Sequence, residues 1–373
     1  MVNGTVQTPS SERLRSLDAL RGFDMFWIMG GEALFTAIAK WWTGSDENWV
    51  HTQLEHVAWH GFRFYDLIFP LFLFLVGVAI PFSLASLARR GASRIEAYWR
   101  IGRRVVLLFL LGLLCNRVLD FHWSELRIAG VLQRIAVCYG IAAMIALHTN
   151  WRGQLVALVV ALVGYWAIMT YVPPPGGTAG DLTPEGSLAG WLDRHYLPGK
   201  IKKPYYGFGD NEGLLSTLPA VGTALLGVLA GHWLRSGRTP AITTLGLASA
   251  GVACLAGGWL WGQTFPINKI LWTSSFVLWA GGWSLLLLAL FYGVIDGLKW
   301  QAWSFFFVVI GANAIAIYVV PRFIDFEHVA QFFFGGTIRH AGDFGPVVAA
   351  AGAIAAEWLL LYLLYRNKLF LRV

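Results

Sequence analysis

Ten long apolar segments recur along the 373 residues of the chain and give the first structural prediction. A transmembrane helix needs about 20 mostly apolar residues, and most of the segments come close to that length. The segments are 19–40, 64–87, 104–119, 127–148, 154–172, 214–234, 240–262, 270–296, 302–321 and 346–365. We therefore predict an all-α, polytopic bundle of about ten transmembrane helices, with room for an eleventh.

The composition agrees with a membrane protein and argues against a soluble enzyme. Hydrophobic residues make up 57% of the chain and charged residues 13%, whereas soluble domains carry about 25% charged residues. The net charge is +7, but the basic residues stand in short clusters between apolar runs and form no phosphate-binding face. A β-barrel is excluded because LFLFLVGVAI at 71–80 lacks the alternation of barrel strands. We expect a lipid bilayer as a partner and no nucleic acid.

The charges of the connecting segments predict the orientation of the bundle. With a cytoplasmic N-terminus, the inner segments hold 15 of the 28 basic residues and three of the 21 acidic residues. The outer segments then hold 13 of the acidic residues. Cytoplasmic loops of membrane proteins carry an excess of Lys and Arg. Both termini are therefore predicted to be cytoplasmic, as an even number of helices requires.

Three longer connections lie on the predicted outer face, at 41–63, 173–213 and 322–345. The middle one opens with the stiff run PPPGGT, and we expect it to form a small extracytoplasmic cap. The start of the chain lacks the apolar core and cleavage site of a signal peptide, so the first apolar segment should be retained. We expect residues 1–373 to form a single transmembrane domain that includes this cap.

The first apolar segment carries four charged residues, Asp18, Arg21, Asp24 and Glu32. Ionisable side chains inside a membrane are costly, so they are functional candidates by default. Asp18 and Arg21 share a helix face, and an ion pair that only positions the helix would explain them. Asp24 and Glu32 lie deeper and about two turns apart on one face. We assign Asp24 and Glu32 to the wall of a substrate-binding cavity.

The densest group of reactive side chains is the outer segment HTQLEHVAWHGFRFYDLIFP at 51–70. Histidine exchanges protons near neutral pH, which suits His56 and His60 to work as a general base or nucleophile. Asp66 enters the membrane where its carboxylate could orient an imidazole and fix its tautomer. We therefore predict His56, Asp66 and His60 as catalytic residues.

Two alternatives remain for the histidines of this segment. His56 and His60 have the i,i+4 spacing of a helical zinc pair, but the HExxH signature is absent and no further His or Cys cluster completes a site. Interfacial histidines without any chemistry would show the same spacing. The three cysteines of the chain lie inside apolar runs with no zinc or disulfide spacing. No metal is therefore expected.

Polar residues interrupt two later apolar segments. Gln133 and Arg134 lie in 127–148, where Arg134 needs a partner, and a buried acid such as Asp24 or Asp66 could serve. Asn313 lies in 302–321, where a hydrogen bond between helices is the simplest role for its amide. No phosphate-binding loop of the GxxxxGK[ST] or GxGxxG type is present, and GxSxG is absent.

These residues resemble the heparan-α-glucosaminide N-acetyltransferase family and its bacterial relatives. The resemblance rests on RLRSLDALRGFDMFWIMGGEAL, HVAWHGFRFYDLIFPLFLFLVG and RIAGVLQRIAVCY, followed in order by DNEGLLSTLPAVGTALLGVLAG, FPINKILWTSSFVL and IGANAIAIYVV. It covers nearly the whole chain. Its most specific motif is H-x-x-W-x-G-x-x-x-x-D-[LI]-[IV]-F-P, which begins at His56 and includes Trp59 and Asp66.

The resemblance implies transmembrane acetylation. Acetyl-CoA from the cytoplasm would supply an acetyl group to the amine of a glucosamine-type sugar on the far side of the membrane, here the bacterial inner membrane. The active histidine of the family falls on His56 and its neighbouring carboxylate on Asp66. His60 stands where the animal enzymes have Asn, so a second imidazole could assist. Relatives suggest a homodimer.

The residues fit this reaction in several roles. His56 could take the proton of the acceptor amine, or it could accept the acetyl group first. Trp59 joins Asp24 and Glu32 as a candidate for binding the sugar. For the coenzyme we propose the cations Arg100, Arg103, Arg104 and Arg134 and the amides of Gln133 and Asn313. The arginines at 100–104 could also reflect positive-inside topology alone.

Two other functions remain open from the sequence. The first is O-acetylation of an envelope glycan, as in the wider acyltransferase superfamily. The second is a proton-coupled transporter that uses the carboxylates Asp24, Glu32 and Asp66 together with Arg134. The absence of a strong internal repeat weakens the transporter interpretation.

Overall fold

The computed structural model describes residues 14–201 and 207–371, and these residues form an all-α protein. No strand occurs within these ranges, apart from one isolated bridge between Arg127 and Gly199. The longer α-helices are α1 (Arg15–Phe26), α2 (Glu32–Thr43), α4 (Ile68–Arg89), α5 (Arg94–Cys115), α6 (Val131–His148), α7 (Trp151–Tyr171), α9 (Thr217–Leu234), α10 (Pro240–Gly262), α11 (Ser274–Phe291), α14 (Phe326–His340) and α15 (Gly345–Arg366). The shorter α-helices are α3 (Trp49–Leu54), α8 (Leu188–Tyr196), α12 (Phe305–Ala312) and α13 (Ala314–Val319).

Seven short helical turns complete the order of elements. They are of the 3-10 or π type and flank or join the longer helices. They are η1 (Trp27–Gly31), η2 (Phe64–Leu67), η3 (Val118–Asp120), η4 (Tyr292–Gly297), η5 (Ala302–Ser304), η6 (Val320–Arg322) and η7 (Gly342–Phe344).

Every one of the ten predicted apolar segments is helical. Within the described ranges, seven helices are long and apolar enough to cross a membrane, or eight if the bent pair α12 and α13 counts as one span. The other two predicted spans are α1 with α2, and α5, which carry many charged residues. The predicted all-α membrane bundle is confirmed, whereas the count of ten spans, or of eleven, stays a prediction.

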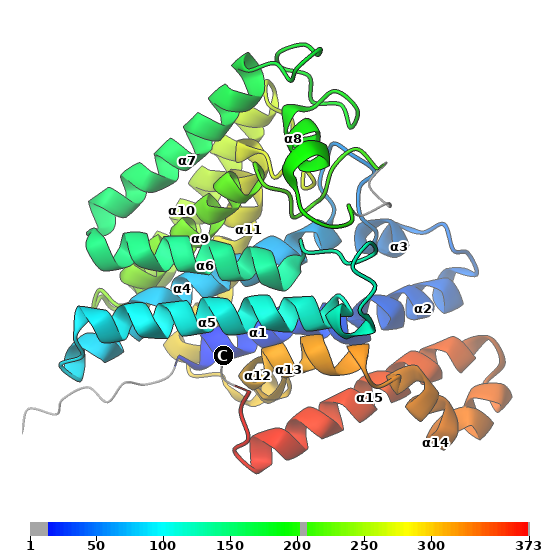
Figure 1. The fold of residues 1–373 in the computed structure, drawn as a ribbon. Coiled ribbons are helices and arrows are strands. Elements are labelled where there is room, and N and C mark those ends of the chain that lie inside the picture. Colours follow the sequence, from blue (N-terminus) through cyan, green and yellow to red (C-terminus); the bar gives the residue numbers. More distant parts are fainter. Residues whose placement is uncertain (1–13, 202–206, 372–373) are drawn as a thin grey trace, which may run out of the picture.

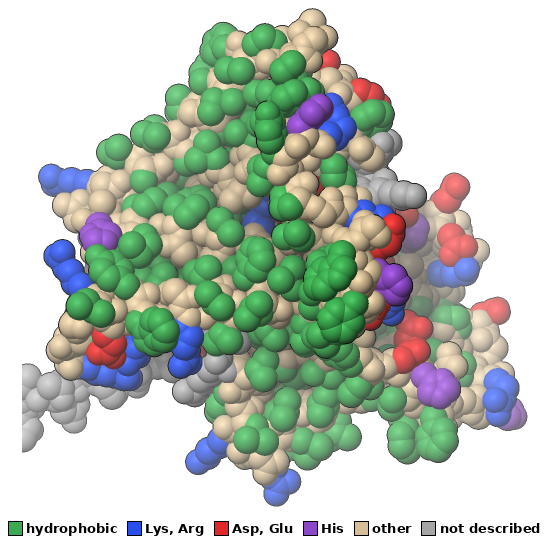
Figure 2. Space-filling model, viewed as in Figure 1, with side chains coloured by type: hydrophobic (Ala, Val, Ile, Leu, Met, Phe, Trp, Pro, Cys, Tyr) green, Lys and Arg blue, Asp and Glu red, His purple; other side chains and the backbone are tan. Residues whose placement is uncertain are grey.

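In Figure 1, α5, α6 and α1 run across the view, while α7 slopes above them and α15 slopes below them. Helices α4 and α9 pack together in the core, while α7, α10 and α15 lie toward the outside of the bundle. Figure 2 shows hydrophobic side chains over most of the visible face, with charged and histidine side chains gathered along its left and right edges. This distribution suits a bundle whose middle faces lipid and whose two ends face water. The chain is an integral membrane protein.

Glycines bring the central helices into close contact. A Cβ at Gly22 of α1 would lie 1.7 Å from the carbonyl oxygen of Phe307, and one at Gly311 of α12 would lie 1.9 Å from that of Asp18. Small residues at helix crossings allow backbones to approach and gain van der Waals contact in a membrane, where hydrophobic burial adds little. The crossing of α1 and α12 therefore depends on these two glycines.

Two of the predicted spans are broken. The first is interrupted by η1, where Gly30 adopts a φ of 109° that favours glycine. The ninth bends by 64° between α12 and α13 at Asn313. Hydropathy alone shows neither break, because the apolar character continues through both.

The predicted cap at 173–213 contains α8, and residues 202–206 within it lie outside the described residues. Asp193 of α8 accepts backbone hydrogen bonds from Asp210 (3.1 Å) and Leu214 (2.8 Å). These bonds fold the described part of the segment back onto itself. The chain ends at 1–13 and 372–373 also lie outside the described residues, and the single-domain organisation stays a prediction.

Candidate active site

The predicted catalytic segment forms a loop between α3 and α4. Asn48 caps the N-terminus of α3, and the chain leaves this helix at Glu55 in extended conformation. It re-enters a helical turn at η2, where the Asp66 carboxylate accepts a hydrogen bond from the backbone of Arg63 (3.0 Å). This local cap directs a completely buried carboxylate into the bundle at the start of α4.

His56 and Asp66 are in direct contact. His56 Nδ1 lies 2.8 Å from Asp66 Oδ1, and the imidazole side chain is 41% exposed. An ionised carboxylate only accepts hydrogen bonds, so Nδ1 donates its proton and the lone pair remains on Nε2. The ring of Tyr65 lies beside the imidazole, with centroids 5.1 Å apart. The pair has the geometry of an oriented base or nucleophile.

Lys269 completes this group, and sequence reasoning missed it. Its Nζ lies 3.3 Å from Asp66 Oδ1, 3.1 Å from His56 Nδ1 and 3.5 Å from His56 Nε2. The Lys269 side chain is only 14% exposed. It comes from the segment FPINKILWTSSFVL, where a single cation just before the predicted span 270–296 was the available signal.

His60 lies in the same loop but has a different partner. The side-chain oxygen of Asn268 accepts the backbone N–H of Leu271 (2.8 Å), so its amide nitrogen is left to donate to His60 Nδ1 (3.3 Å). Partial burial lowers the pKa of His60 from its ordinary value. The backbone N–H of Gly61 also donates to the carbonyl of Ile267 (2.8 Å). Two adjacent segments, 56–66 and 267–271, are thus fastened together.

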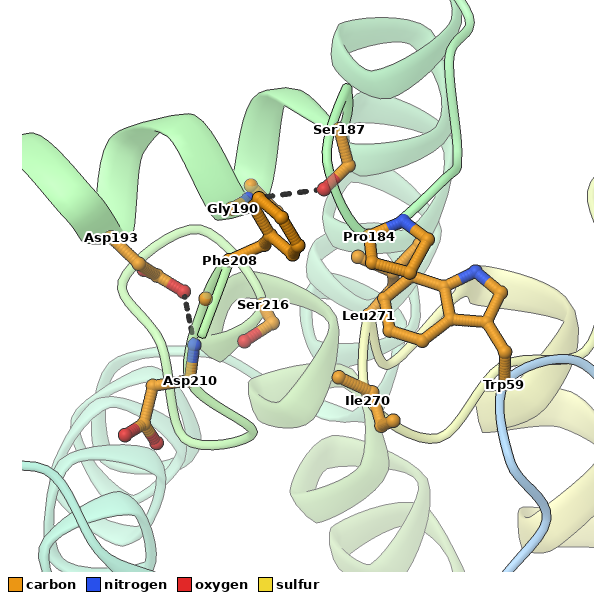
Figure 3. A pocket seen from close by; sticks show the side chains of 12 residues that line it. Trp59, Pro184, Ser187, Gly190, Asp193, Phe208, Asp210, Ser216, Ile270 and Leu271 are labelled. Carbon is orange, nitrogen blue, oxygen red and sulfur yellow. Dashed lines mark hydrogen bonds between the residues drawn. The ribbon is translucent and has the colours of Figure 1, made fainter. Parts of the chain in front are cut away.

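Trp59 connects the loop to the predicted cap. Its Nε1 donates to the carbonyl oxygen of Leu182 (2.8 Å). Figure 3 shows Trp59, Ile270 and Leu271 facing Asp193 and Ser216 across a small cavity beneath α8. The cavity volume is about 20 Å³, which is room for one water molecule. A ligand larger than a water molecule does not fit in this cavity as it stands.

Charged side chains tie the base of the cap to the bundle. Arg127 donates to Asp210 and to Glu212. Burial alone would lower the pKa of Arg127, but the bonds to these two acids raise it above its ordinary value. Burial raises the pKa of Asp193 to about 6, although two backbone N–H groups donate to its carboxylate.

The structure places Arg134 and Gln133 away from the predicted acids. Arg134 is 2% exposed and donates to the carbonyl of Gly213 (3.1 Å) and to the hydroxyl of Ser216. Its guanidinium also lies 5.2 Å from the ring centre of Trp272. The expectation that Asp24 or Asp66 pairs with Arg134 is wrong, because the loop before α9 supplies the acceptors. Gln133 is buried beside Gly112, and its Nε2 has no hydrogen-bond partner among the described residues.

Asp24 and Glu32 lie near the catalytic loop. Asp24 is completely buried, and neither of its oxygens has a hydrogen-bond partner among the described residues. Both acids are close enough to Tyr65 to interact with it electrostatically, and Tyr65 lies beside His56. The predicted ion pair of Asp18 with Arg21 is present at 3.4 Å.

The arginines predicted for the coenzyme border two adjoining cavities near the start of α5. Arg100, Arg103 and Arg104 line a cavity of about 500 Å³. Arg104 also lines a second cavity of about 440 Å³, whose wall includes Arg21 and Phe72. The guanidinium of Arg104 lies 4.5 Å from the ring centre of Tyr139. Two cavities of this size, joined at one cation, offer room for an elongated anionic ligand.

Asn313 holds the segment after α15. Its amide nitrogen donates to the carbonyl of Leu369 (3.2 Å), and its oxygen accepts the N–H of Leu371 (3.0 Å). Phe370 and Leu371 line the 440 Å³ cavity. Asn313 therefore fastens one wall of this cavity, through the chain segment that it holds.

Within residues 14–201 and 207–371, no group of three or more His, Cys, Asp or Glu side chains could hold a metal ion. His56 and His60, the pair with zinc spacing, have Asp66 and Asn268 as their respective partners. The donor set of this loop is therefore organised by hydrogen bonds among protein groups.

Comparisons with known proteins agree with the motifs. Residues 13–181 match a family model described as a domain of unknown function (DUF5009). Heparan-alpha-glucosaminide N-acetyltransferase of Homo sapiens is 28% identical over 97% of this chain and 60% of its own length. The protein of the same name from Mus musculus is 28% identical over 98% of this chain and 61% of its own length. The chain thus spans about three fifths of the length of these relatives, and it is distantly related to the heparan-alpha-glucosaminide N-acetyltransferases.

Proposed function

We propose that the protein is a transmembrane N-acetyltransferase that moves the acetyl group of cytoplasmic acetyl-CoA to the amine of a glucosamine-type sugar on the extracytoplasmic side. The contact of His56 with the buried Asp66 is the observation that carries this proposal. The distant relatives bear the name of such an enzyme. The arginine-lined cavities at the other end of the bundle support two substrates that enter from opposite sides.

At the outer end, His56 would act on the acceptor amine. An amine attacks a thioester only in its unprotonated form, so a base must take its proton. Nε2 of His56 presents a lone pair, and Asp66 would stabilise the imidazolium that forms. The same nitrogen could instead accept the acetyl group and pass it on. Lys269 would hold Asp66 in place through their ion pair.

At the inner end, Arg100, Arg103 and Arg104 would bind the phosphates of the coenzyme. Guanidinium groups bind phosphate oxygens through charge-assisted hydrogen bonds. The adjoining cavity beyond Arg104 would take the uncharged arm, because its wall is largely apolar, with Phe72, Leu108 and Ile135. Asn313 would act through the wall that it fastens, whereas the buried amide of Gln133 packs against Gly112 and lines neither cavity.

Labelled acetyl transfer tests the proposal. Protein reconstituted in lipid nanodiscs is incubated with acetyl-labelled acetyl-CoA and glucosamine, and N-acetylglucosamine is quantified. We expect product with the wild type and a loss of about 10²–10⁴-fold with His56→Ala, as for removal of a general base. His51→Ala is the matched control, since His51 lies in the same outer segment and pairs with Glu55. Equal losses for His56→Ala and His60→Ala would refute the single dominant histidine.

The same experiment separates the alternatives. An O-acetyl product would be cleaved by mild hydroxylamine, whereas the amide survives. A transporter would move solute into vesicles without consuming acetyl-CoA. A single turnover without acceptor would leave the label on His56 only if the imidazole takes the acetyl group first.

The proposed sidedness requires both termini to lie in the cytoplasm, and we propose the bacterial inner membrane as the location. Reporter fusions at each end would test this orientation. The homodimer also stays a prediction, which the mass of the protein in nanodiscs would test.

A further inference from the structure

A cavity of about 670 Å³ lies away from the His56 site. Its walls come from η1 and α2 on one side and from α15 on the other, with η6 and α14 at its outer end. Figure 1 shows α15 and α14 beside α1 and α2 at one edge of the bundle. None of the residues that line this cavity belongs to the loop that carries His56 and Asp66.

A buried carboxylate faces this cavity. Glu357 lies in the apolar helix α15, is 6% exposed and lines the cavity. Its Oε2 has no hydrogen-bond partner among the described residues. A carboxyl group inside a membrane helix is costly unless it meets a partner, and such groups mark binding sites or ion pathways. Glu357 therefore indicates a ligand that supplies this partner.

The rest of the cavity fits an apolar body. Ala349, Ala350 and Ala353 form one wall on α15, and Ala33 and Ala37 of α2 face it. From Pro346 near the outer end to Glu357, α15 advances eleven residues, or about 16 Å. Along α15, Pro346 and three alanines line the cavity before it reaches Glu357. The ligand should carry its polar group at one end.

The charges at the outer end favour a cation. Asp325, Glu327 and Arg322 are the ionisable residues that line the cavity besides Glu357. Asp325 caps α14 through the backbone N–H of His328 (3.0 Å). Two acids against one arginine at this end, with Glu357 at the other, attract a positively charged ligand and repel a carboxylate.

We infer that this cavity binds an amphiphilic primary amine, with the ammonium group paired to Glu357 and the apolar body along the alanine wall. A bound ammonium would satisfy the carboxylate oxygen that has no protein partner. An alcohol of the same length would fill the same space without the charge interaction. The inference does not depend on acetyl transfer at His56.

Protection from a hydrophobic carbodiimide tests the inference. Dicyclohexylcarbodiimide modifies membrane carboxyl groups, and peptide mass spectrometry would report the modification of Glu357 in nanodisc-embedded protein. Decylamine and decanol are added as competitors. We expect decylamine to protect Glu357 at a concentration at least tenfold lower than decanol does. Glu357→Gln should remove the modified peptide and so verify its assignment.

Matched substitutions on α15 complete the test. Ala353→Phe and Ala350→Phe fill the cavity and should abolish protection by decylamine, whereas Ala351→Phe on the exposed face of the same helix should leave it unchanged. Equal protection by decanol and decylamine would overturn the inference. So would an unmodified Glu357 in the wild type, or protection that survives in both cavity-filling variants.

Discussion

Replacing Lys269 by Met should shift the pH dependence of acetyl transfer. The substitution removes a positive charge 3.1 Å from His56 Nδ1 and 3.3 Å from Asp66 Oδ1, and it keeps an unbranched side chain of similar length. A cation beside an imidazole opposes its protonation, and it also competes with the imidazole for the carboxylate. Without Lys269, a positive charge no longer opposes the uptake of a proton by the His56–Asp66 pair. The acidic limb of the rate profile should move upward.

The size of this shift follows from the exposure of the site. Two unit charges 4 Å apart interact by about 1 kcal/mol in water and about 4 kcal/mol near a protein surface. Because the His56 side chain is 41% exposed, the lower part of this range applies. One pH unit corresponds to about 1.4 kcal/mol. We therefore expect a shift of about one pH unit.

The assay is kcat/KM for labelled acetyl transfer between about pH 5 and pH 9. Above the acidic limb, Lys269→Met should keep a rate within a few fold of the wild type, because His56 and Asp66 remain in contact. Lys269→Arg keeps the charge and should leave the limb near its wild-type position. A Met variant that loses activity equally at every pH would refute the reasoning and place Lys269 on the substrate.

Four further predictions follow from the geometry. Asp66→Asn should lower kcat by about 10²–10⁴-fold and leave the protein folded, because an amide can donate to His56 Nδ1 and reverse the tautomer of the imidazole. Acetyl-transfer kinetics measure the loss of kcat, and thermal unfolding checks that the protein is folded. Gly22→Ala and Gly311→Ala should each destabilise the bundle by about 1–3 kcal/mol. Gly102→Ala is the control and should not destabilise it, because the added Cβ would meet nothing within 4 Å. Thermal unfolding in detergent measures the difference. Arg103→Gln and Arg104→Gln should each raise the KM for acetyl-CoA about tenfold with kcat little changed. Arg152→Gln, on another segment that is predicted to be inner, is the control. An unchanged KM would exclude these cations from coenzyme binding. The pKa of Asp193 is raised to about 6 in the folded protein, so the folded state binds this proton more tightly than the unfolded state. The stability of the fold should therefore fall as pH rises from about 4 to about 6. Hydrogen exchange of α8 should accelerate over that range beyond its intrinsic pH dependence, and Asp193→Asn should flatten the change.

The sequence predicted the all-α fold class and the helices, because an apolar run long enough to cross a membrane can fold in few ways other than as a helix. It also indicated that His56 and Asp66 belong together, since Asp66 enters the membrane ten positions after His56, where its carboxylate could orient the imidazole. The 2.8 Å distance between His56 Nδ1 and Asp66 Oδ1 confirms that the two side chains are in contact. The breaks at Gly30 and Asn313 were not predictable, because hydropathy does not register backbone angles.

Contacts between distant segments were beyond sequence reasoning. Lys269 reaches His56 across 213 positions, and no local pattern reports which helix ends meet. Arg134 was assigned an acidic partner by charge, but the backbone carbonyl of Gly213 lies closer in the fold. Asn313 was considered for the coenzyme or for a neighbouring helix, and its amide instead pairs with the backbone after α15. Arg134 and Asn313 thus pair with backbone groups that only the tertiary structure brings near.

The two ends of the proposed reaction are related through α4. Phe72, Val76 and Ala79 lie on one face of this helix and line the cavity next to Arg104. Asp66 precedes Phe72 by six residues, which is about 9 Å along the helix axis. Phe72 thus brings one wall of the cavity near Asp66, but no residue of the His56 loop lines this cavity. If the proposed function holds, the reactive end of the coenzyme must pass Phe72 to reach His56. The rest of the path, between α4 and α1, which carries Asp24, then has to open when substrate binds.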